Sequence, residues 1–442
     1  MTDAGAISKS SENTDPIMAH PSLRELTAAS FKVGCLGFGG PAGQIALMHR
    51  VFVDEKKWIG EQQYLHALNY CMLLPGPEAQ QLATYVGWLL HGVRGGVIAG
   101  LLFVLPGALI VFALSLLYAF AHQEPLVAAA FFGIKAAVLA LVLEACVRIG
   151  KRALKSGTGY AIAIAAFLAL FIGQAPFPLV ILAGAIAGLL FMRGDAPASE
   201  APIANKTSIK GAFASALVWF TAWLAPLGLS MALLGPQHVL TKVGQVFSVL
   251  AVVTFGGAYA TLAYLQQEAV QAQGWLSAGQ MFDGLGLAET TPGPLVLVNQ
   301  FVGFMAGWNA DGGGVWLAAA AALMASWCTF APSFAWVFAG APFAESLRTN
   351  ARATAALKGV TAAVLGVIVN LAIGFAVHYL FGETGRAAIG PHLSILNPDW
   401  ANLDLRAAAV SLAAGVALFC FKMGVLTLIL LSAAAGVALG FV

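Results

Sequence analysis

Two proline–glycine–proline triplets are the residues of this sequence whose types and spacing point most directly to chemistry. Pro75-Gly76-Pro77 interrupts the apolar run YCMLLPGPEAQQLATYVGWLLHG, and Pro292-Gly293-Pro294 interrupts LAETTPGPLVLVNQFVGFMAG. A helix interior does not tolerate such a triplet, whereas proline in the first turn opens a new helix well. Each triplet therefore predicts two short helices that meet at a break. The helix that starts there turns free N–H groups and the positive end of its dipole toward the break, which suits an anion.

Other residues near the breaks could complete an anion site. Glycine pairs let the backbone approach an ion closely, and hydroxyl groups supply donors beside the second break. Besides the two triplets, the candidates for anion binding are Gly39, Gly40, Gly256, Gly257, Thr290, Thr291, Arg50 and Lys135. Proline and glycine are also ordinary kink residues of membrane helices, and one triplet alone would favour that interpretation. Two copies in register, each with an upstream Phe-Gly-Gly, favour a site.

Ionisable residues inside apolar runs form a second group of candidates, because such residues are rare in membranes and usually functional. Lys135 lies in the middle of an apolar run, where contact with the anion and pairing with a carboxylate both stay open. Glu78 and Glu289 flank the breaks, where a carboxylate beside an anion is favoured in its protonated form. Together with Glu144 they are candidates for coupling to protons. The structural alternatives are helix capping for Glu78 and a place at the membrane interface for Glu144.

The elements that hold these residues are membrane helices. The chain has 442 residues, of which 60% are hydrophobic and 10% charged, and its mean hydropathy is +0.84. Soluble domains carry about 25% charged residues, and long apolar runs indicate membrane spans. The predicted fold class is an all-α polytopic membrane protein, since a β-barrel would show short alternating segments. The net charge of +2 is spread over loops and provides no patch for nucleic acid.

The sequence indicates no enzyme, cofactor or metal cluster. The five cysteines are scattered in apolar segments without paired spacing, which predicts packing residues. HExxH, GxSxG and Walker sequences are absent, so the motifs of common hydrolases and ATP-driven pumps are missing. We therefore expect no catalytic residue, no cofactor and no metal. The expected partners are a small anion, protons and the lipid bilayer, and a homo-oligomer is left open.

The chain is a tandem duplication. Residues 38–77 align without a gap on residues 255–294, so the two triplets coincide. The predicted organisation is a polar tail (1–22), a first repeat (23–192), a linker (193–210), an extra apolar helix (211–234) and a second repeat (235–442). Each repeat is predicted to contain a glycine-broken segment, a pair of short helices around its triplet, and four fuller spans.

Loop charges indicate that the second repeat is inverted. The extra helix turns it upside down, and the basic loop 148–157 of the first repeat corresponds to residues 381–385, which contain no Lys or Arg. Conversely, residues 121–125 lack basic side chains, whereas their counterpart near Arg348 and Arg352 is basic. Positive charge marks the cytoplasmic side, so we expect inverted repeats with a cytoplasmic N-terminus. Inverted repeats with discontinuous helices are typical of secondary transporters, whose site lies where the repeats meet.

The same motifs resemble those of the chromate ion transporter family. The resemblance rests on FGGPAGQIALMHRVFVDEKKWI, on LPGPEAQQLATYVGWLLHGVRGG and on their repeat from FGGAYATLAYLQQ to TTPGP, and covers about residues 22–442. Its motif positions are Phe38, Gly39, Gly40, Arg50, Trp58, Pro75, Gly76, Pro77, Phe255, Gly256, Gly257, Trp275, Pro292, Gly293 and Pro294. The chain departs from the family pattern at DEKKW, where other members commonly carry more arginine.

The resemblance implies two homologous halves in the inner membrane that export chromate and confer chromate resistance. The driving force would be the proton gradient or the membrane potential. Chromate resembles sulfate in charge and shape, so uptake or exchange of sulfate or a related oxyanion stays open as an alternative. An anion channel is a further alternative, which would give currents far above the rate of a carrier.

Overall fold

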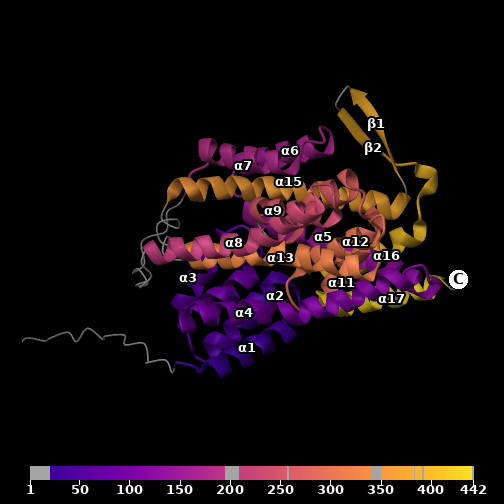
Figure 1. Cartoon of the computed structure of the whole chain (residues 1–442). Coiled ribbons are helices and arrows are strands. Elements are labelled where there is room, and N and C mark those ends of the chain that lie inside the picture. Colours follow the sequence, from indigo (N-terminus) through magenta and orange to yellow (C-terminus); the bar gives the residue numbers. More distant parts are fainter. Residues whose placement is uncertain are drawn as a thin grey trace, which may run out of the picture.

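The structure is a computed structural model that describes residues 20–194, 209–255, 258–340, 350–382, 384–390 and 393–440. Nearly all described elements are helices, as Figure 1 shows, and the chain has the predicted all-α polytopic membrane fold. Among the described residues, five helices are long and apolar enough to cross a membrane: Glu78–Ala121, Pro125–Ala153, Phe213–Leu234, Val315–Gly340 and Ala351–Phe381. Most of the predicted polar tail and of the linker lies outside the described residues.

The first repeat begins with a broken helix and ends with a helical hairpin. Its elements are α1 (Leu23–Leu36), α2 (Gly40–His49), the π-helical turn η1 (Arg50–Glu55), α3 (Glu61–Cys71), α4 (Glu78–Ala121), α5 (Pro125–Ala153), α6 (Gly157–Phe171) and α7 (Phe177–Phe191). Within α4, His91 and Gly92 leave the helical conformation. The part of α4 before this kink is therefore the short helix that the sequence predicts after the first break.

After the connecting helix α8 (Ile209–Leu234), the second repeat presents counterparts of these elements in the same order, with two 3-10 turns and a β-hairpin in addition. They are α9 (Val239–Val253), α10 (Ala258–Leu265), the π-helical turn η2 (Gln266–Ala272), α11 (Ala278–Thr290), the 3-10 turn η3 (Leu295–Leu297), α12 (Val298–Trp308), α13 (Val315–Gly340), α15 (Ala351–Phe381), the 3-10 turn η5 (Trp400–Asn402), α16 (Leu405–Phe419) and α17 (Val425–Gly440). Even the π-helical turn recurs, which supports the tandem duplication inferred from the sequence.

Capping residues fix where several of these helices begin. Ser22 accepts a hydrogen bond from the Glu25 N–H, and the Glu25 carboxylate accepts one from the Ser22 N–H, which closes a capping box at α1. Ser277 and Gln280 form the same arrangement at α11. A cap of this kind stabilises a helix by about 1 kcal/mol. The glycine turn between α1 and α2 instead relies on Gly39, whose φ of 87° favours glycine.

The two repeats are built into one another. Hairpin α6–α7 packs on α15 of the second repeat, as Figure 1 shows, and hairpin α16–α17 packs on α5 of the first. Small residues allow the close approach, because Gly359 of α15 faces Gly184 and Gly188 of α7. Gly133 of α5 faces Gly436 of α17 in the same way. Such small-residue contacts replace the hydrophobic effect as the basis of helix packing in lipid.

The hairpin helices are shorter than the sequence predicts. We expected four fuller spans in each repeat, yet α6, α7 and α16 have 15 residues each and α17 has 16. About 20 residues are needed to cross the hydrocarbon core. The expectation is wrong here because Gln174 and Lys422, with φ values of 47° and 51°, leave the helical conformation at the hairpin turns.

The long helices α5 and α15 occupy the same position in the two repeats but run antiparallel. Near the start of α5, the carbonyl of Phe132 accepts a hydrogen bond of 2.8 Å from the Tyr379 hydroxyl, near the end of α15. Near the end of α5, Gly150 lies beside Leu365, in the middle of α15. This opposite direction supports the inverted repeat, whose orientation in a membrane stays a prediction.

The described residues also include a β-hairpin, which the sequence does not predict. Strands β1 (Gly385–Gly390) and β2 (Leu393–Asn397) pair antiparallel. A lone two-stranded hairpin is marginally stable in water, and this one is tied to the end of α6. The Arg386 guanidinium donates to the Phe171 carbonyl at 2.7 Å, and the Ser394 N–H donates to the Ile172 carbonyl at 3.1 Å.

Candidate functional site

The first break lies between α3 and α4. Gly76 has a φ of 105°, a conformation that glycine adopts without strain. Its N–H donates a hydrogen bond of 2.9 Å to the carbonyl of Thr254, at the end of α9 in the other repeat. The Gln81 side chain, one turn into α4, donates to the Pro75 carbonyl at 2.7 Å. The break is therefore a defined turn anchored on the second repeat.

The second break repeats this geometry between α11 and η3. Gly293 has a φ of 97°, and its N–H donates a hydrogen bond of 3.0 Å to the Gly37 carbonyl at the end of α1. In the alignment of the two repeats, Gly37 is the counterpart of Thr254. The Gln44 side chain donates to the carbonyls of both Gly37 and Gly293. The structure thus joins each Pro-Gly-Pro break to the residue just before Phe-Gly-Gly of the other repeat.

Helices of the opposite repeat that contain an internal proline pack against both breaks. A Cβ at Gly107, next to Pro106 of α4, would lie 2.2 Å from the Pro292 carbonyl oxygen. In α13, Ser333 follows Pro332, and its hydroxyl oxygen lies 3.9 Å from where a Cβ of Gly76 would be. Each break is therefore packed against the proline-containing helix of the other repeat, so both lie where the repeats meet.

Amide side chains of the helices that follow the breaks form hydrogen bonds to the same two proline-containing helices, α13 and α4. The Gln80 amide donates to the Phe330 carbonyl at 3.3 Å, and the Gln300 amide donates to the Ala108 carbonyl at 2.9 Å. Several buried oxygens around the breaks have no hydrogen-bond partner among the described residues: those of the side chains of Gln44, Gln80, Gln81, Asn299, Gln300 and Ser333. Buried polar groups are normally paired. The unpaired set indicates that water or a polar ligand belongs here.

Two carboxyl groups lie at the breaks. Glu289, the next-to-last residue of α11, is 8% exposed and accepts a hydrogen bond of 2.8 Å from the Tyr259 hydroxyl. Glu78 is the first residue of α4 and is half-buried. Neither carboxyl is far from a cation, since the charge of Arg148 acts on Glu289 and that of Arg152 acts on Glu78.

Helix α5 connects the surroundings of the two breaks. Glu144, Arg148 and Arg152 are spaced four residues apart and therefore share one face of this helix. The Glu144 carboxylate pairs with the Arg148 guanidinium at 2.8 Å, and both side chains are about one-third exposed. Glu144 is thus paired with Arg148, and its charge also acts on Glu289, whereas a place at the membrane interface stays a prediction.

Lys135 has a carboxylate partner that we did not identify from the sequence. Its ammonium lies 3.3 Å from an Asp283 carboxylate oxygen, and the other oxygen accepts a hydrogen bond of 2.8 Å from the Tyr118 hydroxyl. Asp283 is 6% exposed. Of the two open interpretations, the structure shows the ion pair. Asp283 could have been found by the rule that singled out Lys135, because it also is an ionisable residue in an apolar helix.

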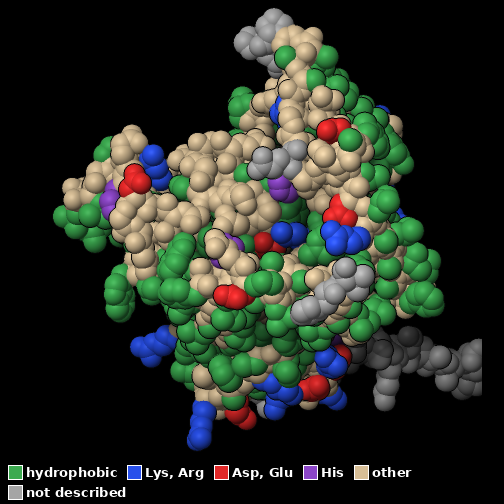
Figure 2. Space-filling model, turned by 90° about the vertical axis from the view of Figure 1, so that its right-hand side faces the viewer, with side chains coloured by type: hydrophobic (Ala, Val, Ile, Leu, Met, Phe, Trp, Pro, Cys, Tyr) green, Lys and Arg blue, Asp and Glu red, His purple; other side chains and the backbone are tan. Residues whose placement is uncertain are grey.

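This pair borders a cavity of about 430 Å³ that Lys135, His378 and Asp404 help to line. Figure 2 looks at the end of the molecule that carries the β-hairpin. It shows a hollow where basic, acidic and histidine side chains gather between apolar flanks. A polar hollow therefore lies at this end of the molecule.

Several predicted site residues have other surroundings. The hydroxyls of Thr290 and Thr291 donate to the carbonyls of Leu287 and Ala288, at 2.8 and 3.0 Å. In this conformation both hydroxyl protons are thus used at the helix end, and the role of the two threonines in anion binding stays a prediction. Gly39 and Gly40 have positive φ and open space around them, and Arg50 is exposed at the start of η1. Gly256 and Gly257, like Arg348, lie outside the described residues.

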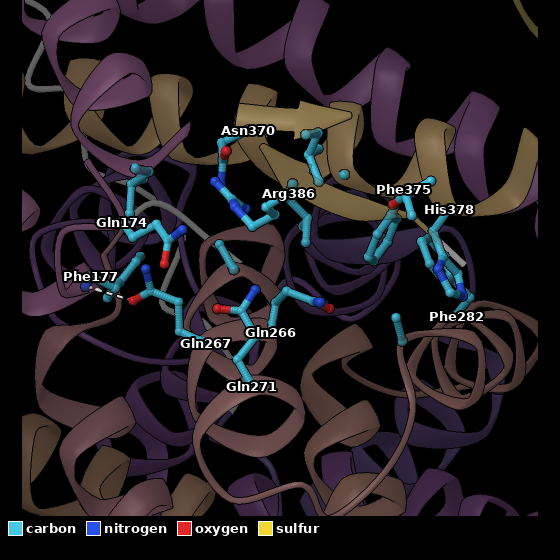
Figure 3. A pocket seen from close by; sticks show the side chains of 17 residues that line it. Gln174, Phe177, Gln266, Gln267, Gln271, Phe282, Asn370, Phe375, His378 and Arg386 are labelled. Atoms are coloured by element: carbon cyan, nitrogen blue, oxygen red, sulfur yellow. Dashed lines mark hydrogen bonds between the residues drawn. The ribbon is translucent and has the colours of Figure 1, made fainter. Parts of the chain in front are cut away.

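A second, smaller cavity of about 150 Å³ lies beside this hollow and is shown in Figure 3. Its polar lining is mostly uncharged and includes Gln174, Gln266, Gln267, Gln271 and Asn370. The side-chain oxygen of Gln267 accepts a hydrogen bond of 2.8 Å from the Phe177 N–H. The side-chain nitrogen of Gln267 donates one of 2.9 Å to the Ala175 carbonyl. Arg386 reaches this amide-lined pocket from the β-hairpin.

The amide-lined pocket and the breaks offer hydrogen-bond donors. The described residues include no group of three or more His, Cys, Asp or Glu that could hold a metal ion.

The family model described as "Chromate transporter" matches residues 24–189 and 241–437, one stretch in each repeat. The chain belongs to this family. Each repeat of this chain therefore carries one stretch that the chromate transporter family model matches, on either side of α8.

Curated relatives agree over most of the chain. A chromate transport protein of Pseudomonas aeruginosa is 34% identical over 418 residues, which cover 93% of this chain and 95% of the relative. A chromate transport protein of Cupriavidus metallidurans is 30% identical, with 80% and 82% covered. A probable chromate transport protein of Synechococcus elongatus is 28% identical, with 80% and 85% covered. No solved structure matches the chain.

Proposed function

We propose that this protein is a secondary transporter that exports chromate across the inner membrane, and that the two breaks form its substrate site. The observation that carries the site is the reciprocal anchoring of Gly76 on Thr254 and of Gly293 on Gly37. It holds two helix starts at the boundary between the repeats, where secondary transporters bind their substrates. The names of the relatives supply the identity of the anion.

The chemistry of the breaks favours an oxyanion. The N-terminus of α4 has no side-chain cap, and its first N–H groups and dipole face the first break. The residues that we propose for anion binding are Gly39, Gly40, Arg50, Pro75, Gly76, Pro77, Lys135, Gly256, Gly257, Thr290, Thr291, Pro292, Gly293 and Pro294. For Lys135 this role requires that the pair with Asp283 opens during transport, and for the two threonines that their hydroxyls rotate.

We propose that carboxyl groups at and near the breaks couple the anion to protons. Glu289 and Glu78 lie at the two breaks, and Glu144 acts on Glu289 from α5. A dianion that enters a break repels an ionised carboxylate, so its arrival favours proton uptake there. Export would then be driven by the proton gradient or the membrane potential, and would protect the cell against chromate. No step of this scheme requires an enzymatic reaction or a cofactor.

The positive-inside rule supports a cytoplasmic N-terminus in the inner membrane. The end of α5 and the following turn contain Arg148, Lys151, Arg152 and Lys155, whereas residues 381–385 at the equivalent place contain no Lys or Arg. The chain then begins at the side from which an exporter takes its substrate.

Flux of radiolabelled chromate into proteoliposomes tests this function. The purified protein is measured with and without an imposed pH gradient, and with excess sulfate outside. Gradient-dependent movement of chromate is the expected result. Movement of sulfate without chromate would mean that the substrate is sulfate, a dianion of similar shape. Currents far above carrier rates would indicate a channel.

A further inference from the structure

A basic cavity lies between the last residues of α5 and the first turns of α15, at the end of the molecule that is remote from the β-hairpin. Its volume is about 640 Å³, and four cationic side chains line it: Arg152, Lys155, Arg193 and Lys358. Four hydroxyl-bearing residues line it as well: Ser156, Thr158, Thr354 and Thr361. The described residues of this lining include no Asp or Glu. Such a composition attracts anions through charge and offers them hydrogen-bond donors.

The cavity lies close to the first break. Leu73, two residues before Pro75, belongs to its lining. Arg152 belongs to the lining too, and its charge acts on Glu78 at the start of α4. The Lys358 ammonium donates to the Arg193 carbonyl at 3.0 Å, which holds this cation at the cavity wall. An anion collected here is therefore close to the proposed substrate site.

The repeat-related cavity at the opposite end has a different charge. In the alignment that brings Pro106 onto Pro332, Lys155 corresponds to Phe381, Lys358 to Phe132, Arg152 to His378 and Thr361 to Lys135. Phe381, Phe132, His378 and Lys135 all line the cavity of about 430 Å³. In this cavity the ammonium of Lys135 is already paired with Asp283, and Asp404 adds a negative charge. The two cavities are thus equivalent in position and unequal in charge.

We propose that the basic cavity is a capture vestibule for tetrahedral oxyanions, and that its weakly charged counterpart is the release side. This inference rests on the proposed function and adds to it the residues that set affinity on one side. A concave surface with charges of one sign raises the local concentration of counter-ions. Free oxyanions and the phosphates of lipid headgroups share the chemistry that this cavity recognises, so the test has to separate them.

Chromate uptake into inside-out membrane vesicles tests the vestibule, because it presents the cytoplasmic side outward. The variants are Lys155→Gln and Lys358→Gln. The matched control is Lys151→Gln, since Lys151 is exposed at the same end of α5 but does not line the cavity. Removing one lining charge is expected to raise KM about threefold to tenfold with kcat unchanged. Salt at about 0.5 M should remove most of the difference, because it screens charges beyond a few Å.

The outcomes separate the two proposals. If the wild type transports chromate while both cavity variants have the KM of the Lys151→Gln control, the vestibule is refuted and the proposed function remains. If the wild type moves no chromate, the proposed function fails. Chromate and sulfate binding to the same purified variants then decides the vestibule, with Kd unchanged by Lys358→Gln refuting it.

Lipid composition identifies the occupant. The KM effect is expected in proteoliposomes of purely zwitterionic lipid as well as in those with phosphatidylglycerol. An effect that appears only with the anionic lipid would mean that a headgroup phosphate occupies the cavity, which overturns capture of the free anion.

Discussion

The backbone N–H of Gly76 donates a hydrogen bond to the carbonyl of Thr254 across the boundary between the two repeats, at 2.9 Å. The equivalent bond joins Gly293 to Gly37 at 3.0 Å. Each break is therefore held by the repeat to which it does not belong. Rocking of one repeat against the other, the usual motion of inverted-repeat transporters, would displace both breaks together. This gives the two ends of the protein a means to open in alternation.

The break glycines are expected to be essential for transport. Gly76→Ala and Gly293→Ala place a side chain at φ values of 105° and 97°, which costs about 1–2 kcal/mol or more and shifts the N–H that makes the cross-repeat bond. We expect at least a tenfold loss of chromate flux in proteoliposomes, with the protein still extracted as a folded species.

Gly415→Ala is the matched control for these substitutions. Gly415 lies in helix α16 with no atom within 4 Å of an added Cβ, so this change should leave flux and thermal stability unchanged. Normal flux in both break variants would show that the geometry of the triplets does not serve the substrate.

Charge pairing between Lys135 and Asp283 predicts that single substitutions destabilise the protein more than the double one. Asp283→Asn leaves Lys135 without its counter-charge, and Lys135→Met leaves a carboxylate that is 6% exposed. Loss of one partner of a buried pair costs up to about 3–5 kcal/mol, whereas replacement of both by apolar residues is often neutral. In thermal unfolding in detergent, the double variant Lys135→Met/Asp283→Leu should have a higher melting temperature than each single variant.

Flux through the double variant separates the pairing role of Lys135 from contact with the anion. If Lys135 serves only as the partner of Asp283, the stable double variant transports at a near-normal rate. A stable double variant without flux would show instead that the ammonium itself meets the substrate.

The sequence predicts the breaks well because their causes are local. Pro-Gly-Pro stops a helix whatever surrounds it, and the short helix before His91 follows from the spacing of Pro77 and Gly92. The all-α class follows equally from composition. These features need no knowledge of how the helices pack.

Partners across helices could not be predicted in the same way. The contact between Lys135 and Asp283 depends on how α5 and α11 are rotated toward one another, which no spacing within one helix determines. The hydroxyl of Thr291 was expected to face the substrate, but the Ala288 carbonyl three residues earlier is a nearer acceptor. The β-hairpin depends on contacts of Arg386 and Ser394 with the end of α6, which belongs to the other repeat.

Glu289 is expected to carry the coupled proton. Glu289→Gln keeps an acceptor for the Tyr259 hydroxyl, which lies 2.8 Å away, but cannot ionise. Chromate exchange at equal pH should persist in this variant, whereas stimulation of flux by a pH gradient should disappear. Measuring exchange and net flux in the same proteoliposomes checks this expectation.

Glu144→Gln is the comparison for the coupling prediction. The pair of Glu144 with Arg148 is about one-third exposed, where an ion pair contributes at most about 1 kcal/mol. We expect this variant to retain its response to the pH gradient. Loss of the response here, with Glu289→Gln still coupled, would move the proton site to α5.

The inverted topology predicts that equivalent loops of the two repeats lie on opposite sides of the membrane. Lys151→Cys and Gly385→Cys should react with an impermeant thiol reagent from the cytoplasmic and the outer side, respectively. The background has to be the Cys420→Ser variant, because Cys420 is the exposed one of the described cysteines. Labelling of both positions from one side would exclude the inversion.

The contacts of hairpins with long helices predict that two distant glycines are equally intolerant of substitution. A Cβ at Gly359 would lie 2.2 Å from the Gly184 carbonyl oxygen, and one at Gly133 would lie 1.7 Å from the Ser432 carbonyl oxygen. Both distances require backbone to move, at a cost of about 1–3 kcal/mol for an overpacked interface. Because each site joins one repeat to the other, Gly133→Ala and Gly359→Ala should lower the apparent melting temperature to a similar extent. Gly228→Ala in α8, where the space for a Cβ is open, should not. Unequal effects at the two sites would mean that the repeats depend on one another less symmetrically than their contacts indicate.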